Sequence, residues 1–255
     1  MSTPSSFQGM TALVTGASNG IGAAAAVGFA RGGAHVLVHY CNDRAAAESV
    51  LSQVACSGGS GELIQADLSS AEGVYGFLAL VAKTGHTVDI LVNNAGSLVK
   101  RTRLLEFTDE LWHQVFMLNF HSAFMITRAL MPAMVERKLG YVVNISSVAA
   151  RNGGGLGAMA YASAKGALSV MTKGLAKEFA PQGVRVNAVS PGTIDTNYHR
   201  TFSTEQMLAG VRAATPAGRL GTSEEVADVI LFLCSEGARF IQGQVIEVNG
   251  GFLMV

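Results

Sequence analysis

The amino-acid sequence predicts an α/β protein with one doubly wound parallel sheet of about seven strands and helices on both faces. Apolar runs of strand length alternate with helix-length segments from one end of the chain to the other. Several runs are rich in β-branched residues and almost continuously apolar, as strands are when both faces of a parallel sheet are covered. A glycine-rich turn follows the first run directly, and nucleotide-binding sheets carry their phosphate turn at that place.

The expected strands alternate with helices in a β–α–β order that implies right-handed crossovers. In chain order they are Thr11–Thr15, His35–His39, Glu62–Gln65, Asp89–Asn93, Tyr141–Ile145, Arg185–Val189 and Val245–Val248. Thr222 and Glu225 have the spacing of a capping box and predict a helix that ends near Cys234. No composition shift, linker or repeat divides the chain, so residues 1–255 are expected to form a single domain for dinucleotide binding and catalysis.

Two segments interrupt the alternation. Asn152–Gly157 is rich in glycine and is expected to bend its backbone close to another part of the chain. Asp195–Gly221 is a long connection with helical character at Glu205–Arg212, and such loops commonly cover a site, so we expect a mobile substrate lid. This lid includes Tyr198, Phe202, Met207 and Leu208. They suit a wall against an acyl chain or hydrophobic ketone, and packing of the lid onto its own domain is the alternative.

Composition limits the classes of partner. Charged residues make up 14% of the chain, against about 25% in an average soluble domain. This low charge favours burial between subunits, and the apolar helical segments Leu111–Met134 and Ala160–Phe179 are expected at the interfaces. The formal net charge is +0, so no global field attracts nucleic acid or an anionic membrane.

The chain also has the features expected of a cytoplasmic protein. Met1–Gln8 lacks the basic start and apolar stretch of a signal peptide, and no segment has the roughly 18 apolar residues that span a bilayer. The three cysteines are widely spaced without a Cys-x-x-Cys pair, as in a reducing compartment. The six histidines show no ligand grouping, because His35 and His39 are spread along one expected strand, so no metal site is expected.

The turn Thr15–Gly22 links the first strand to the first helix. Its glycines allow positive φ and close approach of the backbone to a pyrophosphate at the helix N-terminus. A packed strand–helix junction is the alternative for such a pattern alone, but its position favours a dinucleotide site of the Rossmann type. The expected cofactor contacts in the turn are Gly16, Ser18, Asn19, Gly20, Ile21 and Gly22.

The end of the second strand predicts which dinucleotide binds. The residues there are His39, Tyr40, Cys41 and Asn42, with no carboxylate to accept the ribose hydroxyls of NAD. Arg44 or His39 could pair with a 2′-phosphate, whereas Asn19 stands where a basic residue would strengthen that preference. NADP(H) is therefore favoured, with NAD(H) as the alternative, and Tyr40, Asn42 and Arg44 are the candidate contacts.

Two further strand ends supply candidate cofactor contacts. Asp67, followed by Leu68, is expected to accept a hydrogen bond from the adenine amino group, and capping of the next helix is the alternative role of Asp67. Asn94, Ala95 and Gly96 follow the fourth strand and would line the cofactor channel, with asparagine side chains tying neighbouring strands together.

Four polar residues form a candidate catalytic set: Asn119, Ser147, Tyr161 and Lys165. Tyr161 and Lys165 are four residues apart, so on a helix they share one face. A free tyrosine has a pKa near 10, and a neighbouring ammonium favours the phenolate that proton transfer requires. Ser147 can hydrogen-bond a carbonyl oxygen as charge develops. Asn119 lies in an apolar helical context, where a water relay to Lys165 would give its side chain a hydrogen-bond partner. Taken singly, each of the four residues could also have an ordinary structural role.

Over nearly its whole length the chain resembles the short-chain dehydrogenase/reductase family. The motifs Thr15–Gly22, Asn93–Gly96, Tyr161–Lys165 and Pro191–Thr193 occur in family order with Asn119 and Ser147. The resemblance implies a catalytic Asn–Ser–Tyr–Lys tetrad, a lysine that also holds the nicotinamide ribose, and a homotetramer. It also implies that Thr193 and Ile194 grip the carboxamide of the cofactor, and Pro191, Gly192 and Thr196 beside them are further expected cofactor contacts. Ser147 precedes Tyr161 by one residue more than is commonest, and Asn152–Gly157 is expected to absorb the difference.

Within that family the ends Pro216–Gly221 and Val248–Val255 are similar to those of 3-oxoacyl-acyl-carrier-protein reductases. Those enzymes use basic residues near the active site to dock the acidic carrier. Lys138 matches one docking position, but Gln182 occupies another. The expected substrate is therefore a small carbonyl or alcohol compound, including a 3-oxoacyl thioester. The alternative functions within the family are those of small-alcohol, sugar and steroid dehydrogenases. A dinucleotide-binding regulator without turnover is the alternative from another class.

Overall fold

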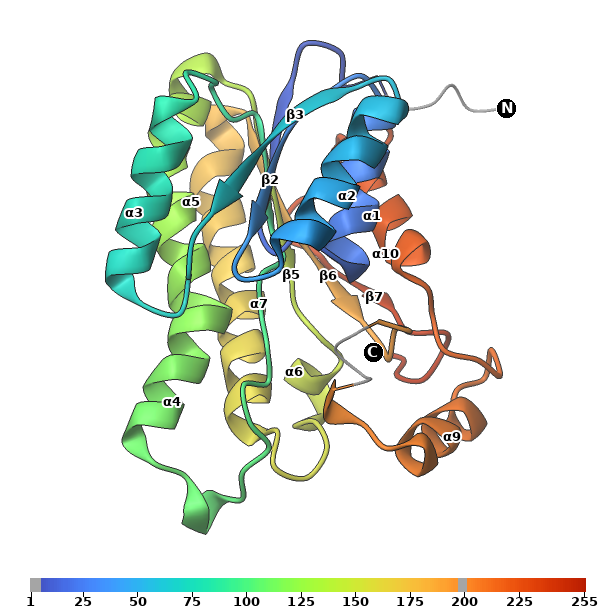
Figure 1. Cartoon of the computed structure of the whole chain (residues 1–255). Helices are drawn as coiled ribbons and strands as arrows, with labels where there is room; N and C mark the ends of the chain where they lie inside the picture. Colours follow the sequence, from blue (N-terminus) through green and yellow to red (C-terminus); the bar gives the residue numbers. More distant parts are fainter. Residues whose placement is uncertain (1–5, 197–200) are drawn as a thin grey trace.

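The computed structural model describes residues 6–196 and 201–255. Seven strands form one parallel sheet in the order β3-β2-β1-β4-β5-β6-β7 (Figure 1). The strands are β1 (Thr11–Val14), β2 (His35–Tyr40), β3 (Ser60–Gln65), β4 (Ile90–Asn93), β5 (Gly140–Ile145), β6 (Val184–Pro191) and β7 (Val245–Val248). The predicted sheet is confirmed, with shifts of one or two residues at seven of the fourteen strand ends.

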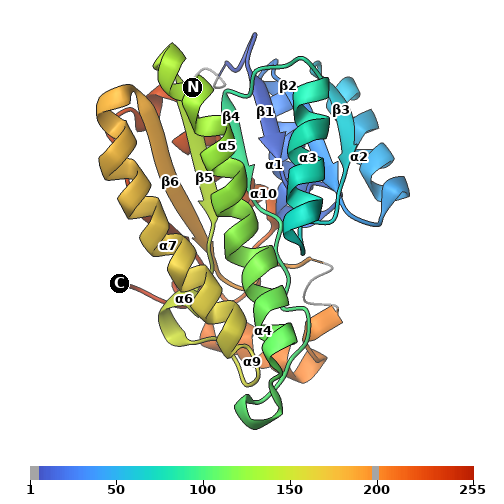
Figure 2. The ribbon, with the colours of Figure 1, turned by 90° about the vertical axis from the view of Figure 1, so that its left-hand side faces the viewer.

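Helices cover both faces of the sheet. One face carries α1 (Gly20–Arg31), α2 (Arg44–Cys56) and α10 (Ser223–Leu233). The other carries α3 (Ala71–Lys83), α5 (Ser122–Arg137) and α7 (Met159–Phe179), which run side by side in Figure 2. Three shorter helices lie beyond the carboxyl ends of the strands: α4 (Asp109–Phe116), α6 (Ala149–Asn152) and α9 (Glu205–Ala214).

Successive strand residues point into two separate hydrophobic cores. Leu13 and Leu37 belong to the core under α3 and α5, while Val14 and Val38 belong to the core under α1 and α10. Because the inner parallel strands are buried on both faces, most of their residues must be apolar. This explains the continuous apolar runs from which the sequence predicted the sheet.

The predicted helix ends agree with the structure except at Leu111–Met134. Thr222 and Glu225 form the predicted capping box, and α10 ends at Leu233 with Cys234 as its C-cap. The segment Leu111–Met134 is interrupted by a π-helical turn at Met117–His121, which separates α4 from α5. Among the described helices, none combines the length and apolar character needed to cross a bilayer.

Candidate active site

The glycine turn joins β1 to α1 at the carboxyl edge of the sheet. Gly16 and Gly20 have positive φ angles of 62° and 56°, as expected for this turn. A Cβ at Gly22 would lie 2.4 Å from the Gly16 carbonyl oxygen, so only glycine fits between the turn and the helix. Asn19 precedes α1 without capping it through its side chain, and the first helical turn contains no acidic residue. The amino end of α1 is therefore suited to an anionic group.

His39 supports the glycine turn from beneath. Its Nδ1 accepts a hydrogen bond from the Gly16 N–H at 2.9 Å, so its Nε2 donates to the Ala66 carbonyl oxygen at 3.1 Å. Burial lowers the pKa of His39 to about 4, which keeps the ring neutral. The prediction that His39 could pair with a 2′-phosphate is thus wrong, because both ring nitrogens are used inside the protein.

The other residues beyond β2 form an exposed rim. Arg44 is the first residue of α2, and its guanidinium pairs with Glu48 at 2.8 Å. Asn42 and Arg44 are exposed, whereas Tyr40 is buried and its hydroxyl donates to Gln65 Oε1 at 3.5 Å. Arg44 is therefore the cation that this rim offers to a phosphate, and Tyr40 can contribute through its backbone.

Asp67 and Leu68 follow β3 at the same edge. The carboxylate of Asp67 accepts a hydrogen bond from the Ser69 N–H at 2.8 Å and is exposed. The alternative that Asp67 caps the next helix is wrong, because Ser70 is the N-cap of α3 and accepts from the Gly73 N–H. The Leu68 side chain is buried in the core, so only its backbone can face a ligand.

Asn93 and Asn94 tie neighbouring strands together, as predicted. Asn93 Nδ2 donates to Asn144 Oδ1 on β5 at 2.8 Å. Asn94 Nδ2 donates to the carbonyl oxygens of Thr15 and Gly16, both at 2.9 Å. The backbone from Asn94 to Gly96 is thereby held against the glycine turn, where a Cβ at Gly16 would lie 2.9 Å from the Ala95 Cα.

Asn119 lies within the π-helical turn and is 1% exposed. Its Nδ2 donates to the carbonyl oxygens of Ser97 and Val115, and its Oδ1 accepts from the Ser97 N–H at 3.1 Å. Sequence reasoning expected a water to satisfy this side chain, whereas the Ser97 peptide does so. Single π-helical turns are frequent at functional sites, but their position could not be predicted from the apolar pattern.

Lys165 lies close to both Asn119 and Tyr161. A Cβ at Gly96 would lie 2.7 Å from Asn119 Oδ1 and 3.0 Å from Lys165 Nζ, so these two atoms flank the same point. Lys165 Nζ donates to the Ile145 carbonyl oxygen at 2.8 Å and lies 5.8 Å from the centre of the half-buried Tyr161 ring. Burial lowers the pKa of the Lys165 ammonium to about 8.

Ser147 lies two residues beyond β5 and is half-buried. Its Oγ accepts a hydrogen bond from the Ala149 N–H at 3.1 Å, while Val148 is the N-cap of α6. That bond uses a lone pair and leaves the hydroxyl proton for donation to a carbonyl oxygen. Ser146 is oriented differently, because its hydroxyl bonds the Lys165 carbonyl oxygen and Ser169.

The segment after β6 closes the base of the expected lid. The Gly221 N–H donates to the Thr193 carbonyl oxygen at 3.1 Å, and the Asp195 N–H donates to the Gly221 carbonyl oxygen at 2.9 Å. A Cβ at Gly20 would lie 3.3 Å from Thr196 Cγ2, so Thr196 reaches the glycine turn. Helix α9 confirms the predicted helical character, and none of its residues is buried. Tyr198, expected in the lid wall, lies outside the described residues.

Sequence reasoning missed Arg101. Its Nε donates to the Phe202 carbonyl oxygen at 2.9 Å, and its Nη1 donates to the Leu156 carbonyl oxygen at 3.0 Å. One side chain thus connects the loop after β4, the glycine-rich loop and the lid segment. A Cβ at Gly157 would lie 3.0 Å from the Thr102 nitrogen, which is the close approach expected of that loop. Arg101 could not be identified from sequence because its partners are backbone carbonyls 55 and 101 residues away.

The expected carrier-docking position is far from this edge. Lys138 is the C-cap of α5 and lies two residues before β5, whereas Ser147 lies two residues after β5 ends. The six residues of β5 separate them by roughly 20 Å, so within one chain Lys138 lies at the opposite end of the sheet. Within one chain Lys138 is thus remote from the active-site edge, and its match to a carrier-docking position stays a prediction.

Comparison with known proteins identifies the family. Residues 16–253 match the profile described as enoyl-(acyl carrier protein) reductase. The 3-oxoacyl-(acyl-carrier-protein) reductase of Escherichia coli (strain K12) is 39% identical over 98% of this chain and 99% of its own length. The chain belongs to the short-chain dehydrogenase/reductase family. It is accordingly an oxidoreductase, as the tetrad and the glycine turn predicted.

Solved structures of short-chain dehydrogenase/reductases agree in fold and differ in assigned substrate. A protein from Beutenbergia cavernae, assigned as an NAD(P)-dependent gluconate 5-dehydrogenase and solved with NADP, has a TM-score of 0.91 and 37% identity, with 98% of this chain and 99% of that one covered. A 3-oxoacyl-(acyl-carrier-protein) reductase from Brucella melitensis with bound NAD has a TM-score of 0.88 and 34% identity, with 98% and 93% covered.

Proposed function

We propose that this oxidoreductase interconverts a carbonyl group and a secondary alcohol with NADP(H), and that Tyr161 is the acid/base. The observation that carries the proposal is the approach of buried Asn119 and Lys165 to one point at Gly96, beside Tyr161. A buried ammonium next to a phenol favours the charged form of the phenol, as proton transfer near neutral pH requires. A binding protein without turnover has no need for this arrangement.

The residues at the carboxyl edge fit a phosphorylated dinucleotide. The uncapped amino end of α1 and the positive-φ glycines suit the pyrophosphate, Asp67 suits the adenine, and exposed Arg44 suits a 2′-phosphate. Thr193, Ile194 and Thr196 lie at the lid base, where they would hold the carboxamide end. When bound there, NADPH would supply a hydride to the carbonyl carbon.

The chain's own residues would handle the proton. As the carbonyl oxygen gains negative charge, Ser147 donates a hydrogen bond to it and Tyr161 transfers its phenolic proton, which completes the alcohol. The phenolate that remains is stabilised by the Lys165 ammonium. Tyr161 is then reprotonated from solvent by way of Lys165 and the polar atoms at Asn119. Oxidation of the alcohol runs through the same proton transfers in reverse.

A 3-oxoacyl thioester is the substrate that we propose first. The support is the family profile, the 39% identical reductase and the apolar side chains of the lid, such as Met207, which is 41% exposed. A sugar acid is the second candidate, because Arg101 brings a positive charge to the lid and a protein of 37% identity is assigned as a gluconate 5-dehydrogenase. The two candidates differ in charge and polarity, so kinetics can separate them.

The test is a steady-state comparison on one preparation. Acetoacetyl carrier protein, acetoacetyl coenzyme A and 5-ketogluconate are each assayed with NADPH and with NADH. If the substrate is a thioester, kcat/KM should be highest with an acetoacetyl group. If Lys138 does not dock the carrier, kcat/KM with acetoacetyl carrier protein should not exceed that with acetoacetyl coenzyme A. Higher efficiency with 5-ketogluconate would transfer the assignment to sugar acids. Tight NADPH binding with no turnover on any carbonyl would favour the regulator instead.

We further propose a homotetramer. Apolar side chains remain exposed on the outer helices and in the turn before β7, including Val170 at 69% and Phe240 at 101% exposure. Strand β7 forms one edge of the sheet and would help to close an interface. Light scattering at micromolar protein should give four times the 26.5 kDa chain mass, and a monomer would overturn the proposal. The free cysteines suit a cytoplasmic location.

A further inference from the structure

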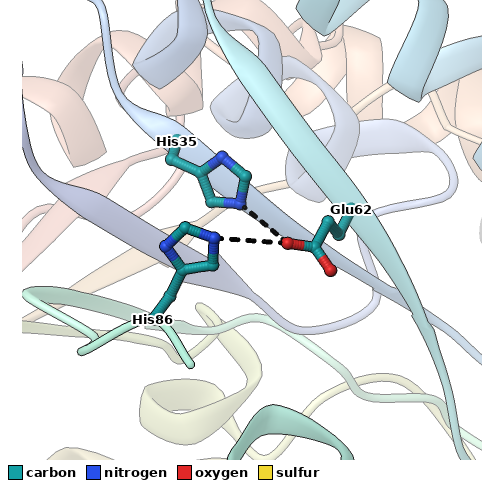
Figure 3. A group of neighbouring side chains, drawn as sticks. All are labelled: His35, Glu62 and His86. Carbon is teal, nitrogen blue, oxygen red and sulfur yellow. Dashed lines mark ion pairs between the residues drawn. The ribbon is translucent and has the colours of Figure 1, made fainter. Parts of the chain in front are cut away.

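The opposite, amino-terminal edge of the sheet carries a group of three potential metal ligands. His35 begins β2, Glu62 lies on β3, and His86 lies in the connection between α3 and β4 (Figure 3). Glu62 Oε1 is 3.4 Å from His35 Nε2 and 3.3 Å from His86 Nε2. The fold brings these residues together from three separate segments, which is why the histidine spacing in the sequence gave no sign of them.

The orientation of His35 is fixed by a second residue. Its Nδ1 lies 2.8 Å from the Ser60 hydroxyl, which occupies the paired position on β3. Its Nε2 is buried and faces Glu62 Oε1 at 3.4 Å, but the geometry does not make a well-formed hydrogen bond. A buried nitrogen of this kind needs a partner, and metal-bound histidines use their other nitrogen in just such a hydrogen bond.

The spacing of the ligand atoms suits a small tetrahedral ion. Zinc bonds of about 2.0–2.1 Å place neighbouring ligands about 3.3 Å apart at the corners of a tetrahedron. The two measured nitrogen–oxygen distances are 3.4 Å and 3.3 Å, and one ligand atom from each residue lies within 4.8 Å of the others. The two imidazole rings stack with centroids 4.0 Å apart, so coordination requires them to splay. His86 can turn, because its side chain is 38% exposed.

We propose that His35, Glu62 and His86 bind a divalent transition metal, with Zn²⁺ the best fit and water as the fourth ligand. Two imidazoles and one carboxylate form a ligand set that zinc accepts and that hard cations such as Mg²⁺ do not prefer. No other group of three such residues within 4.8 Å occurs in residues 6–196 and 201–255.

The position of the site indicates a structural effect. Strand β3 is the outermost strand of the sheet on this side, and its exposed residues outnumber its buried one. A metal held by all three residues would link β3 to β2 and to the start of the segment leading into β4. Because the tetrad lies at the carboxyl edge, metal binding should stabilise the fold and leave turnover nearly unchanged. The proposal is thus independent of the proposed function.

The test uses the full chain without a histidine tag, stripped with chelator, at pH 7.5. Zn²⁺ titrated against a chromogenic chelator should bind at one ion per chain, and Tm should rise with Zn²⁺ concentration. Glu62→Gln and His86→Gln should each lower affinity more than about 100-fold, and Ser60→Ala about tenfold, since loss of an outer partner alone costs roughly 10- to 100-fold. His113→Gln, at an exposed position on α4, is the matched control and should bind as the unmodified protein does.

Co²⁺ provides a second readout that distinguishes this site from the cysteines. Nitrogen and oxygen ligation should give visible ligand-field bands without the intense near-ultraviolet band of a cobalt–thiolate bond, and Cys56→Ser should leave the spectrum unchanged. Circular dichroism and oxidoreductase activity confirm that each variant folds. The proposal is overturned if Zn²⁺ affinity is the same in the unmodified protein and the folded His86→Gln variant, or if the Co²⁺ spectrum disappears in Cys56→Ser.

Discussion

The interior of the active site and its rim are built differently. In the interior, Asn119, Lys165 and His39 are at most 3% exposed, and each hydrogen-bonds main-chain groups of another segment. On the rim, Arg44 is exposed and pairs with Glu48 on its own helix, and α9 buries none of its residues. The interior is therefore fixed by the fold, whereas the rim is held by few contacts.

This difference suggests a division of labour. Under the proposed function, the buried groups with fixed partners would be pre-organised for the proton transfer and would also contribute to the stability of the fold. Rim groups can rearrange at low cost, so they would determine which cofactor and which carbonyl compound bind. Changes in the interior should alter kcat and stability, while changes on the rim should alter KM and selectivity.

The largest expected effect is that of Tyr161→Phe. Removal of the hydroxyl takes away the proton donor, so kcat should fall by about 10²-fold or more. NADPH binding, followed by fluorescence, should survive, because the ring remains. Tyr75→Phe, at a position 59% exposed on α3, is the control and should retain full turnover. Near-normal kcat in Tyr161→Phe would contradict the assignment of the tetrad.

Lys165 should make stability depend on pH in the cofactor-free protein. Burial lowers its folded-state pKa from 10.5 to about 8, so below pH 8 both folded and unfolded chains bind the proton and the folded state carries the full penalty. Between pH 8 and 10.5 the unfolded chain binds more protons than the folded chain. The free energy of unfolding should therefore rise with pH by about 3 kcal/mol over this range.

Lys165→Met removes that contribution and supplies the measurement. Denaturant unfolding of both proteins across this pH range should show the stability of the unmodified chain rising relative to the variant. Lys173→Met, at an exposed position of the same helix, controls for loss of charge. A stability difference between the unmodified chain and Lys165→Met that stays constant with pH would show that the ammonium is not strained by burial.

The same division explains what the sequence could predict. Strand runs buried on both faces, such as Val36–Val38, consist of apolar residues throughout, so the sheet could be predicted from the sequence. The tetrad could be proposed because the chemistry requires its residue types and because they occur in the order of the family that the chain resembles. The π-helical turn around Asn119 was not, since it changes hydrogen-bond register without changing the apolar pattern.

Other features depend on contacts that no local pattern records. His39 was interpreted as a possible phosphate ligand because a histidine at a strand end can either bind a phosphate or support a neighbouring turn. Only its burial and its hydrogen bond to Gly16 show that it supports the turn. Lys138 was matched to a docking position without knowledge of which end of the sheet it occupies. Arg101 binds carbonyl oxygens, which every residue has, so its partners leave no signature in the sequence.

On the rim, Arg101→Ala should have the third-largest effect, a rise in KM for the carbonyl substrate. Loss of the bonds to Phe202 and Leu156 frees the lid segment, so KM for the carbonyl substrate should rise about tenfold while kcat changes less, as for loss of a charge-assisted bond of about 1.5 kcal/mol. Amide exchange over residues 201–214 should become faster. Arg103→Ala, exposed in the same loop, is the control. Unchanged KM and unchanged exchange would show that Arg101 does not hold the lid.

The smallest expected effect is that of Arg44→Ala on the preference for NADPH over NADH. In the unmodified protein kcat/KM should be higher with NADPH than with NADH. Arg44→Ala should reduce the ratio of these two kcat/KM values about fivefold, since an exposed charge pair contributes up to about 1 kcal/mol.

Glu48 competes for the Arg44 guanidinium at 2.8 Å, so Glu48→Gln should increase the NADPH-to-NADH ratio instead. Arg31→Ala, at the far end of α1, should leave it unchanged. Opposite shifts in the Arg44 and Glu48 variants, both weakened by added salt, would identify a 2′-phosphate contact on the rim. A preference for NADH in the unmodified protein would instead show that the missing carboxylate after β2 does not select the cofactor.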